Sequence, residues 1–204
     1  MWDKREAVPI MSCTLNPSPH HLSIESKKHR GYVASIAGRT YRCLVGKKGF
    51  QLAKDKAEGD GCTPVGVFPL RQLFYRPDVY GTGDLVTSLE TQVIQPFFGW
   101  CDASSHPDYN RLVDLRLFEK DISHEKMWRE DPLYNIVIAI GYNDDPVIKG
   151  KGSAIFIHLA REGYRGTRGC IALSESDMRE VITYLSPGSM IVIEGETPSP
   201  SLQS

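Results

Sequence analysis

Two short segments in the last third of the sequence are apolar at almost every position. Residues 134–140 read YNIVIAI and residues 154–159 read AIFIHL. Runs of this length are short for a buried helix, and they are rich in β-branched residues, which favour strands. A strand that is apolar on both faces has to be covered on both sides. The two segments therefore predict central strands of a sheet, and the fold has to be built around them.

The other strand signals are shorter and are separated by turn residues, as in a meander. One of them follows a turn-rich loop, GDGCTPVG, at residues 59–66. Strands are expected at residues 22–26, 31–36, 40–45, 67–73, 112–118 and 190–194.

One helix is predicted, beginning at Ser174. Ser174 followed by Asp177 resembles a capping box, and Pro187 with Gly188 ends the helix. Its apolar side chains recur at helical spacing on one face: Met178, Val181, Ile182 and Leu185. The chain is therefore expected to be mostly β, with one amphipathic helix packed on the sheet.

Both ends of the chain and one long internal stretch lack regular patterns. Residues 1–20 are expected to form an irregular N-terminal extension, and the polar residues 196–204 a mobile tail. The stretch from residue 75 to about 130 is rich in Pro, Gly, Asp and Trp. So long an irregular insertion in a compact domain is usually a lid or a binding loop. A single domain is predicted over residues 21–195.

Composition excludes several classes of function. A net charge of −1 gives no basic surface for nucleic acid or for a membrane. No apolar stretch approaches the roughly 18–20 residues of a membrane-spanning helix. The N-terminal residues contain no secretory signal core. The five cysteines include no C-x-x-C pair, and no His, Asp or Glu cluster has metal-ligand spacing. We therefore expect no membrane span and no metal.

One histidine and one cysteine have the arrangement of a thiol acyl-transfer site. His158 lies at the end of the second apolar segment, and Cys170 follows a glycine in the sequence TRGC. In such a site the thiolate attacks a carbonyl, the imidazole removes and returns the proton, and backbone N–H groups hold the oxyanion. Each residue alone is more often structural than catalytic. On these residues alone, a catalytic pair and a coincidence both remain open.

The residues before Cys170 favour the catalytic interpretation. Thr167 and Arg168 place a hydroxyl and a positive charge beside the thiol. Gly169 removes a side chain where a substrate carbonyl would approach the backbone. Cationic neighbours lower the pKa of a thiol from about 8.5. We therefore expect a lowered pKa for Cys170.

These motifs resemble those of a known family. The sequences AIFIH and TRGCIAL, at residues 154–158 and 167–173, resemble the His…Ser/Thr-x-Gly-Cys signature of the L,D-transpeptidase (YkuD-type) catalytic domain. The loop GDGCTPVGVF at residues 59–68 is similar to that family's Gly-Asp-x-x-Thr-Pro-x-Gly-x-Phe segment. The resemblance covers roughly residues 22–194. A bacterial branch of the family is suggested by residues 100–102, 109–110, 123–124 and 141–143.

The resemblance implies a YkuD-like β-sandwich that acts on peptidoglycan stem peptides without a cofactor. Carried onto this chain, it implies that Cys170 is the nucleophile and His158 the general base. Gly169 and the backbone N–H of Cys170 become candidates for oxyanion stabilisation, and Thr167 for a supporting hydroxyl. Carbapenem-type β-lactams become expected covalent inhibitors.

One motif position departs from the family pattern, and other polar residues are weaker candidates. Many members have histidine where this chain has Arg168, which could instead pair with a substrate carboxylate. His124 either lines the cleft or is a surface or packing residue. Asp102, Tyr109 and Asn110 could contact substrate, although turn and capping roles suit them equally well.

Three functions are weighed on this basis. The first is a peptidoglycan L,D-transpeptidase that forms an acyl-enzyme on Cys170, releases D-alanine and transfers the acyl group to an amine. The second is an L,D-carboxypeptidase or amidase that uses water at the same site. The third is a non-catalytic peptidoglycan-binding module with an inert thiol. The substrate would place the protein in the periplasm or cell envelope, although no export signal is visible.

Overall fold

The computed structural model describes residues 19–27, 31–118, 121–161, 163 and 165–195. Most of the predicted N-terminal extension and all of the predicted tail lie outside the described residues. Among the residues described, no helix is long and apolar enough to cross a membrane.

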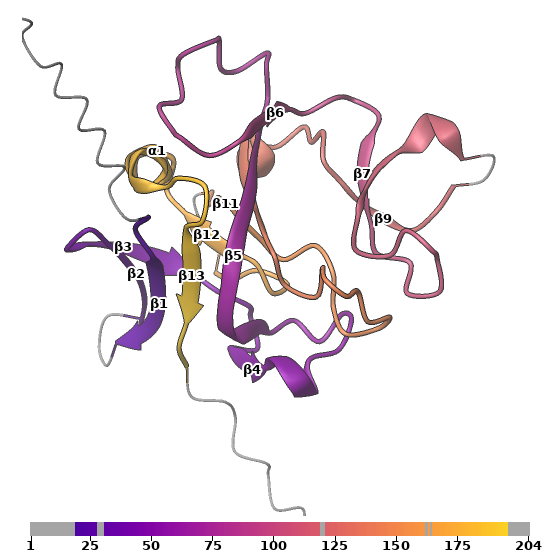
Figure 1. The fold of residues 1–204 in the computed structure, drawn as a ribbon, viewed down its shortest axis with the longest axis horizontal. Coiled ribbons are helices and arrows are strands. Elements are labelled where there is room, and N and C mark those ends of the chain that lie inside the picture. The colour runs from indigo at the N-terminus through magenta and orange to yellow at the C-terminus, as the bar shows by residue number, and fades with distance from the viewer. Residues whose placement is uncertain (1–18, 28–30, 119–120, 162, 164, 196–204) are drawn as a thin grey trace, which may run out of the picture.

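Over the residues that the structure describes, the chain is mostly β with one α-helix, as expected (Figure 1). The main sheet has the strand order β10-β11-β12-β3-β2-β1-β13-β5-β4, with β6 beside β5. The strands are β1 (Leu22–Lys27), β2 (Gly31–Ile36), β3 (Arg39–Leu44), β4 (Phe50–Leu52), β5 (Thr63–Tyr75), β6 (Thr91–Val93), β7 (Phe98–Cys101), β8 (Leu112–Asp114), β9 (His124–Lys126), β10 (Ile136–Ile140), β11 (Phe156–Leu159), β12 (Ile171–Leu173) and β13 (Met190–Ile193).

Strand β5 closes the main sheet on itself. Its first half pairs antiparallel with β13, from Gly66 opposite Ile193 to Pro69 opposite Met190. Its second half pairs with β10, and β10 pairs with β11 on its other edge. The strand is 13 residues long and therefore extends beyond the predicted residues 67–73 at both ends. Because β5 pairs with β13 along one half and with β10 along the other, the two ends of the strand order are joined.

The predicted central strands β10 and β11 are confirmed, since every residue in both is buried. Successive side chains of a strand point to opposite faces. In β10, Ile136 and Ile138 pack in the main core, which the closed sheet surrounds, while Val137 and Ala139 pack in a second core. The second core consists of Phe74, Ile94, Met127, Leu133, Tyr134, Val137, Ala139, Phe156 and Cys170.

Helix α1 (Glu175–Val181) covers the main core. The hydroxyl of Ser174 accepts the backbone N–H of Asp177 at 3.1 Å, so the predicted N-cap is confirmed. Met178 and Val181 are fully buried, and the last turn tightens into the 3-10 helix η4 (Ile182–Tyr184). The predicted apolar face therefore begins on the α-helix α1 and continues onto the 3-10 helix η4.

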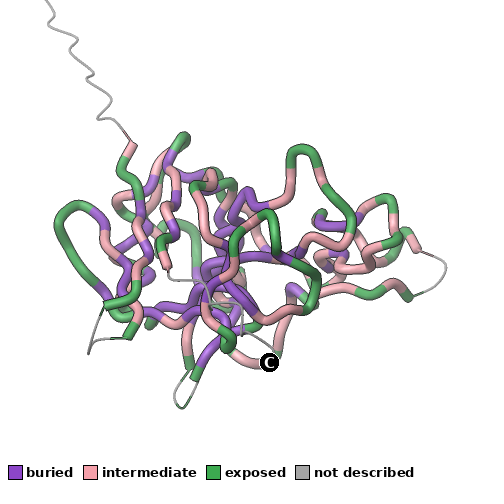
Figure 2. The backbone as a smooth tube through the Cα atoms, turned by 90° about the horizontal axis from the view of Figure 1, so that it is seen from below, coloured by how far each residue is buried: buried purple, intermediate pink, exposed green. Residues whose placement is uncertain are grey.

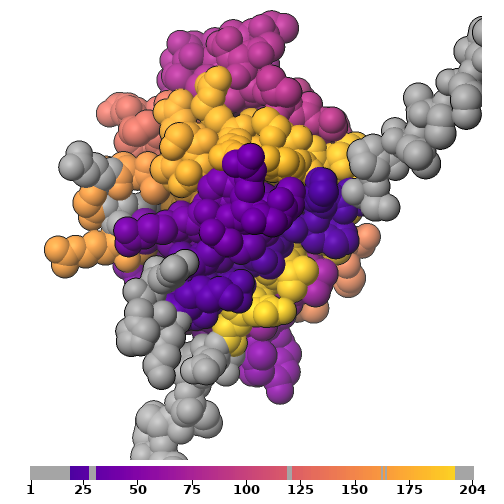
Figure 3. Space-filling view, turned by 90° about the vertical axis from the view of Figure 1, so that its left-hand side faces the viewer, coloured from indigo at the N-terminus to yellow at the C-terminus, as the bar shows by residue number. Residues whose placement is uncertain are grey.

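The N-terminal strands and the C-terminal strand lie side by side. Strand β1 pairs in parallel with β13, with Leu22 opposite Ile191. Figure 3 shows this face, where the N-terminal strands in indigo lie against C-terminal residues in yellow. In Figure 2 the buried segments gather in the middle of the molecule and the exposed ones at the loops.

The long insertion carries a small sheet of its own, in the order β8-β7-β9. Trp100 of β7 packs edge-on against Phe156 and Phe74, with ring centroids 5.0 and 6.3 Å apart, so the insertion covers the second core. The predicted strand at residues 112–118 is shorter, because η2 (Leu115–Leu117) follows β8. A further turn, η3 (Pro132–Tyr134), leads back into β10, and η1 (Ala53–Asp55) follows β4.

Candidate active site

The pairing of β11 with β12 brings Cys170 and His158 to the same face of the sheet. The two strands are parallel, with His158 opposite Ala172. Continuing this register back places Cys170 beside Phe156, whose backbone N–H donates to the Cys170 Sγ at 3.4 Å. Residues two apart on a strand share a face. Cys170 and His158 are therefore diagonal neighbours on the side of the second core.

The Cys170 thiol is held close to the backbone and is only 8% exposed. It donates to the carbonyl of Ala154 at 3.2 Å. Burial raises the pKa of this thiol to about 12; the hydrogen bond from the Phe156 N–H and, to a smaller extent, the charge of Lys56 lower it only in part. The expected pKa lowering by Arg168 is therefore wrong, because desolvation of the thiolate outweighs the cations nearby. At neutral pH the sulfur is a thiol.

His158 is buried and neutral as well. It is 3% exposed, and burial lowers its pKa to about 4. Its Nδ1 lies 2.8 Å from the carbonyl oxygen of Leu159, and a carbonyl can only accept. Nδ1 therefore carries the proton, which leaves Nε2 as the basic nitrogen. The ring of Tyr134 packs edge-on at 5.4 Å between centroids and limits the ring's movement.

Two buried threonines hold the backbone around Cys170. The Thr167 hydroxyl donates to the Cys170 carbonyl at 2.6 Å and accepts the Gly169 N–H at 3.0 Å. The Thr63 hydroxyl donates to the Gly169 carbonyl at 2.8 Å and accepts the Gly46 N–H at 2.9 Å. Thr63 belongs to the GDGCTPVG loop. Its role in the site was missed because the sequence does not show which distant backbone groups its hydroxyl contacts.

Gly169 has a structural reason to be glycine. Its φ is +136°, and an added Cβ would lie 2.9 Å from the carbonyl oxygen of Cys62. Its N–H is bonded to Thr167, so it is not available as the oxyanion donor that the sequence suggested. The N–H of Cys170 makes none of the hydrogen bonds found among the described residues, and it remains the candidate donor.

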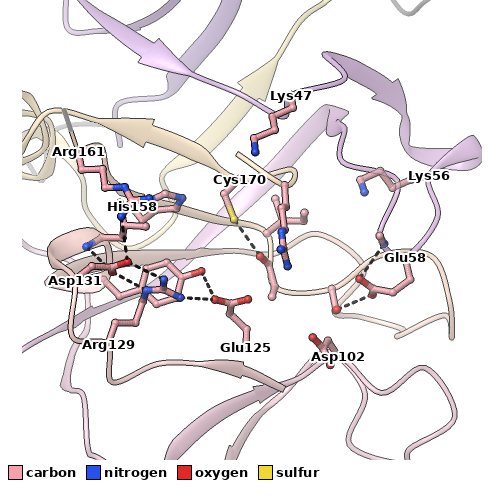
Figure 4. Close-up of a pocket in the computed structure, with 17 residues that line it drawn as sticks. Lys47, Lys56, Glu58, Asp102, Glu125, Arg129, Asp131, His158, Arg161 and Cys170 are labelled. Atoms are coloured by element: carbon pink, nitrogen blue, oxygen red, sulfur yellow. Dashed lines mark hydrogen bonds and ion pairs between the residues drawn. The ribbon is translucent and has the colours of Figure 1, made fainter. Parts of the chain in front are cut away.

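A polar pocket of about 520 Å³ opens over this pair (Figure 4). In that view Cys170 lies between His158 on one side and Lys56 with Glu58 on the other. The pocket is lined by Lys47, Lys56, Glu58, Gly59, Asp102, Glu125, Arg129, Asp131, Leu133, Tyr134, Ser153, Ala154, Ile155, His158, Arg161, Arg168 and Cys170.

The histidine end of the pocket contains an ion-pair network that sequence reasoning missed. Arg129 donates to both carboxylate oxygens of Asp131, at 2.8 and 2.9 Å, and to Glu125 at 3.1 Å. The Tyr134 hydroxyl donates to the same oxygen of Glu125 at 3.1 Å. The sequence does show that these four polar residues lie within ten positions of one another. It does not show which way they face, because the insertion has no regular pattern.

The opposite end of the pocket is formed by the segment before the GDGCTPVG loop. Lys56 is 2% exposed and its Nζ bonds to Asp60 at 2.6 Å. Glu58 accepts hydrogen bonds from the hydroxyls of Ser153, at 2.6 Å, and Tyr109. Neither Lys56 nor Glu58 was a candidate from sequence.

Of the weaker candidates, Arg168 and Asp102 line the pocket, while Tyr109, Asn110 and His124 do not. This placement of the last three differs from the substrate contacts expected. Tyr109 is 1% exposed, and its hydroxyl donates a hydrogen bond to the carboxylate of Glu58, which does line the pocket.

Asn110 acts on the pocket wall through the backbone. Its side-chain oxygen accepts the N–H of Ala154 at 3.0 Å and the indole N–H of Trp100 at 2.9 Å. Ala154 is the residue whose carbonyl accepts the Cys170 thiol. His124 packs beside Gly99, with Nδ1 at 2.6 Å from the carbonyl of Ile122. Asn110 therefore supports the site through the backbone of Ala154, and neither Asn110 nor His124 lines the pocket.

Comparison with known proteins finds similar solved structures and a matching family model. No curated protein matches the sequence. Among solved structures, an L,D-transpeptidase from Mycobacterium smegmatis is 12% identical over 86% of this chain and 59% of its own, with a TM-score of 0.39. Bdellovibrio bacteriovorus Bd1075 is 16% identical over 87% of this chain and 48% of its own, with a TM-score of 0.44.

A third solved structure is that of L,D-transpeptidase 3 from Mycobacterium tuberculosis in complex with a faropenem-derived adduct. It is 12% identical over 86% of this chain and 60% of its own, with a TM-score of 0.38. The chain thus spans less than two thirds of the length of each of these structures. A model of the L,D-transpeptidase catalytic domain, YkuD, matches residues 25–193. The chain belongs to the L,D-transpeptidase catalytic domain (YkuD) family.

Proposed function

We propose that this protein is a peptidoglycan L,D-transpeptidase that works through an acyl-enzyme on Cys170. The observation that carries the proposal is the parallel pairing of β11 with β12, which sets the thiol and the imidazole on one face at a polar pocket. The substrate is a tetrapeptide stem, the leaving group is D-alanine, and the acceptor is an amine.

The first half-reaction forms a thioester. His158 Nε2 takes the proton of the Cys170 thiol as the sulfur attacks the carbonyl before the terminal D-alanine. The oxyanion of the tetrahedral intermediate is held by the backbone N–H of Cys170. The imidazolium then returns the proton to the nitrogen of the leaving D-alanine, and the C–N bond breaks. Since both groups are neutral at rest, proton transfer accompanies the attack and no preformed thiolate is needed.

The second half-reaction resolves the thioester. An acceptor amine attacks the carbonyl and gives its extra proton to His158. The C–S bond breaks, the sulfur takes the proton back, and a new amide is released. Water in place of the amine gives the carboxylate product of an L,D-carboxypeptidase.

Product analysis tests the proposal. The purified protein is incubated with a tetrapeptide stem, with and without an amine acceptor, and the products are identified by mass spectrometry. We expect D-alanine release together with an acyl–amine product. Hydrolysis alone, with the acceptor present, would assign the site to a carboxypeptidase. No D-alanine release under either condition would refute the enzymatic proposal and favour a binding module.

The same thiol is proposed to react with carbapenem-type β-lactams, since their strained ring presents an acyl carbonyl that a nucleophile opens. Intact-protein mass spectrometry should detect one added carbapenem, and Cys170→Ala should not gain it. An adduct that persists in this variant would contradict the assignment of the nucleophile. We also propose a location in the cell envelope, because the substrate lies there.

A further inference from the structure

Lys56 is a buried cation in the wall of the pocket. It follows the 3-10 helix η1 and is 2% exposed, yet it lines the pocket. In Figure 4 the nitrogen end of its side chain is directed toward the side on which Cys170 lies. A lysine is almost never fully buried unless it is paired. Its burial in the wall of the pocket that also contains Cys170 therefore calls for an explanation.

The lysine side chain is held in one position. Its Nζ donates to Asp60 Oδ1 at 2.6 Å and to the Ala57 carbonyl at 3.4 Å. Its stem lies along Gly152, where an added Cβ would be 3.4 Å from both the Cγ and the Nζ. Asp60 is itself fixed, because it also accepts the backbone N–H groups of Cys62 and Ala57. The ammonium is thus placed before any ligand arrives.

This ammonium keeps a donor for a ligand. An ammonium has three N–H groups, and the described residues supply two acceptors, Asp60 and Ala57. The nearby carboxylate of Glu58 is occupied by Ser153 and Tyr109. The charge of Lys56 is felt at the reacting sulfur, since it acts to lower the pKa of Cys170 against the larger effect of burial.

The other cations of the pocket are less suited to this task. Arg129 is bonded to two carboxylates, Asp131 and Glu125, whereas Lys56 is bonded to one, Asp60. Lys47, Arg161 and Arg168 are exposed, so water and salt screen their charges. A buried, fixed ammonium binds an anion more strongly than a mobile surface lysine, because less entropy is lost and screening is weaker.

We propose that Lys56 is a specificity residue that binds a carboxylate of the stem peptide while Cys170 attacks. The inference rests on the proposed function and adds to it the group that is recognised. A stem peptide has two carboxylates that an ammonium could bind in this way. One is the C-terminal carboxylate of the leaving D-amino acid, and the other is a side-chain carboxylate of a diamino diacid in the stem.

Three synthetic peptides distinguish the two sources. One tetrapeptide stem has both carboxylates free, the second has a C-terminal amide, and the third has a side-chain amide. For the wild-type protein, kcat/KM should fall about 10- to 100-fold for the amide that removes the recognised carboxylate, as expected for the loss of a charge-assisted hydrogen bond. The other amide should behave like the free acid.

Variants of Lys56 test whether this residue causes the preference for the free carboxylate over the amide. Lys56→Met should lower kcat/KM for the free acid and abolish the discrimination between acid and amide, so that the ratio approaches one. Lys56→Arg should keep part of the ratio, because it keeps the charge. Lys54→Met is the matched control, since Lys54 is an exposed lysine two residues away that does not line the pocket. Lys56→Met/Asp60→Asn removes both members of the ion pair and is used if the single variant does not fold.

The results separate this inference from the proposed function. If wild-type protein released the terminal residue from all three peptides at similar kcat/KM (D-alanine from two of them and D-alaninamide from the C-terminal amide), the carboxylate inference would be overturned and the transpeptidase proposal would stand. The inference would also be overturned if Lys56→Met lost activity equally on acid and amide, because a purely structural role leaves the ratio unchanged. If wild-type protein turned over no stem peptide, the proposed function would fail, and the inference would fall with it.

Discussion

Removing the Thr63 hydroxyl should destabilise the loop that carries Cys170. Thr63 is fully buried, and its hydroxyl links the backbone of Gly46 to that of Gly169. Thr63→Val keeps the shape of the side chain and leaves one N–H and one carbonyl without their partner. Each unsatisfied buried group costs about 1–3 kcal/mol. Local relaxation recovers part of this cost, so we expect the free energy of unfolding to fall by about 2–4 kcal/mol.

The loss should also reach the chemistry, because Gly169 precedes the nucleophile. A reacting group displaced by roughly 1 Å can lose about 100-fold in rate, so kcat/KM for D-alanine release should fall at least about tenfold. Urea unfolding gives the stability, and peptide turnover well below the unfolding midpoint gives the activity. Thr40→Val is the matched control, because Thr40 is exposed on β3. A Thr63→Val protein within about 0.5 kcal/mol of wild type, with unchanged turnover, would refute the reasoning.

Three further predictions concern the reacting pair and its support. Cys170→Ala and His158→Ala should each abolish D-alanine release while circular dichroism stays like that of wild type; turnover by either would contradict the roles proposed. Burial lowers the pKa of His158 from 6.5 to about 4, so between these values the unfolded state binds a proton that the folded state excludes. Stability should therefore fall as the pH falls through this window, by up to about 1.4 kcal/mol per pH unit, and His158→Gln should lack this component in urea unfolding. Asn110→Ala should lower kcat more than it raises KM, because Asn110 supports Ala154 from outside the pocket; an unchanged kcat would exclude this role.

The parts of the fold that follow from local pattern could be predicted. β10 and β11 were predictable because a strand covered on both sides needs apolar residues at successive positions. Ser174 predicted the start of α1 because capping involves only residues three apart. The closure of the sheet through β5 could not be predicted, since it depends on which distant strands pair with each half of that strand.

The candidate site divides in the same way. His158 and Cys170 could be predicted, because the end of one strand and the start of the next bring them together. Arg129 and Glu125 could not, because the path of the insertion decides which of its charged residues turn toward the pocket. For Asn110 the sequence showed a polar side chain near a turn, and only the fold shows that it bonds to the backbone of Ala154.

The same strand pattern that predicts the fold also limits the chemistry. Because β11 is covered on both faces, His158 is buried in the strand, and burial favours its neutral form. Cys170 immediately precedes the neighbouring strand β12 and is subject to the same desolvation. A thiolate–imidazolium pair would place two charges on two buried side chains, which costs more than their attraction returns unless further polar groups solvate them. The pair therefore starts neutral, and charge develops only when a substrate carbonyl is present to accept the sulfur's electrons.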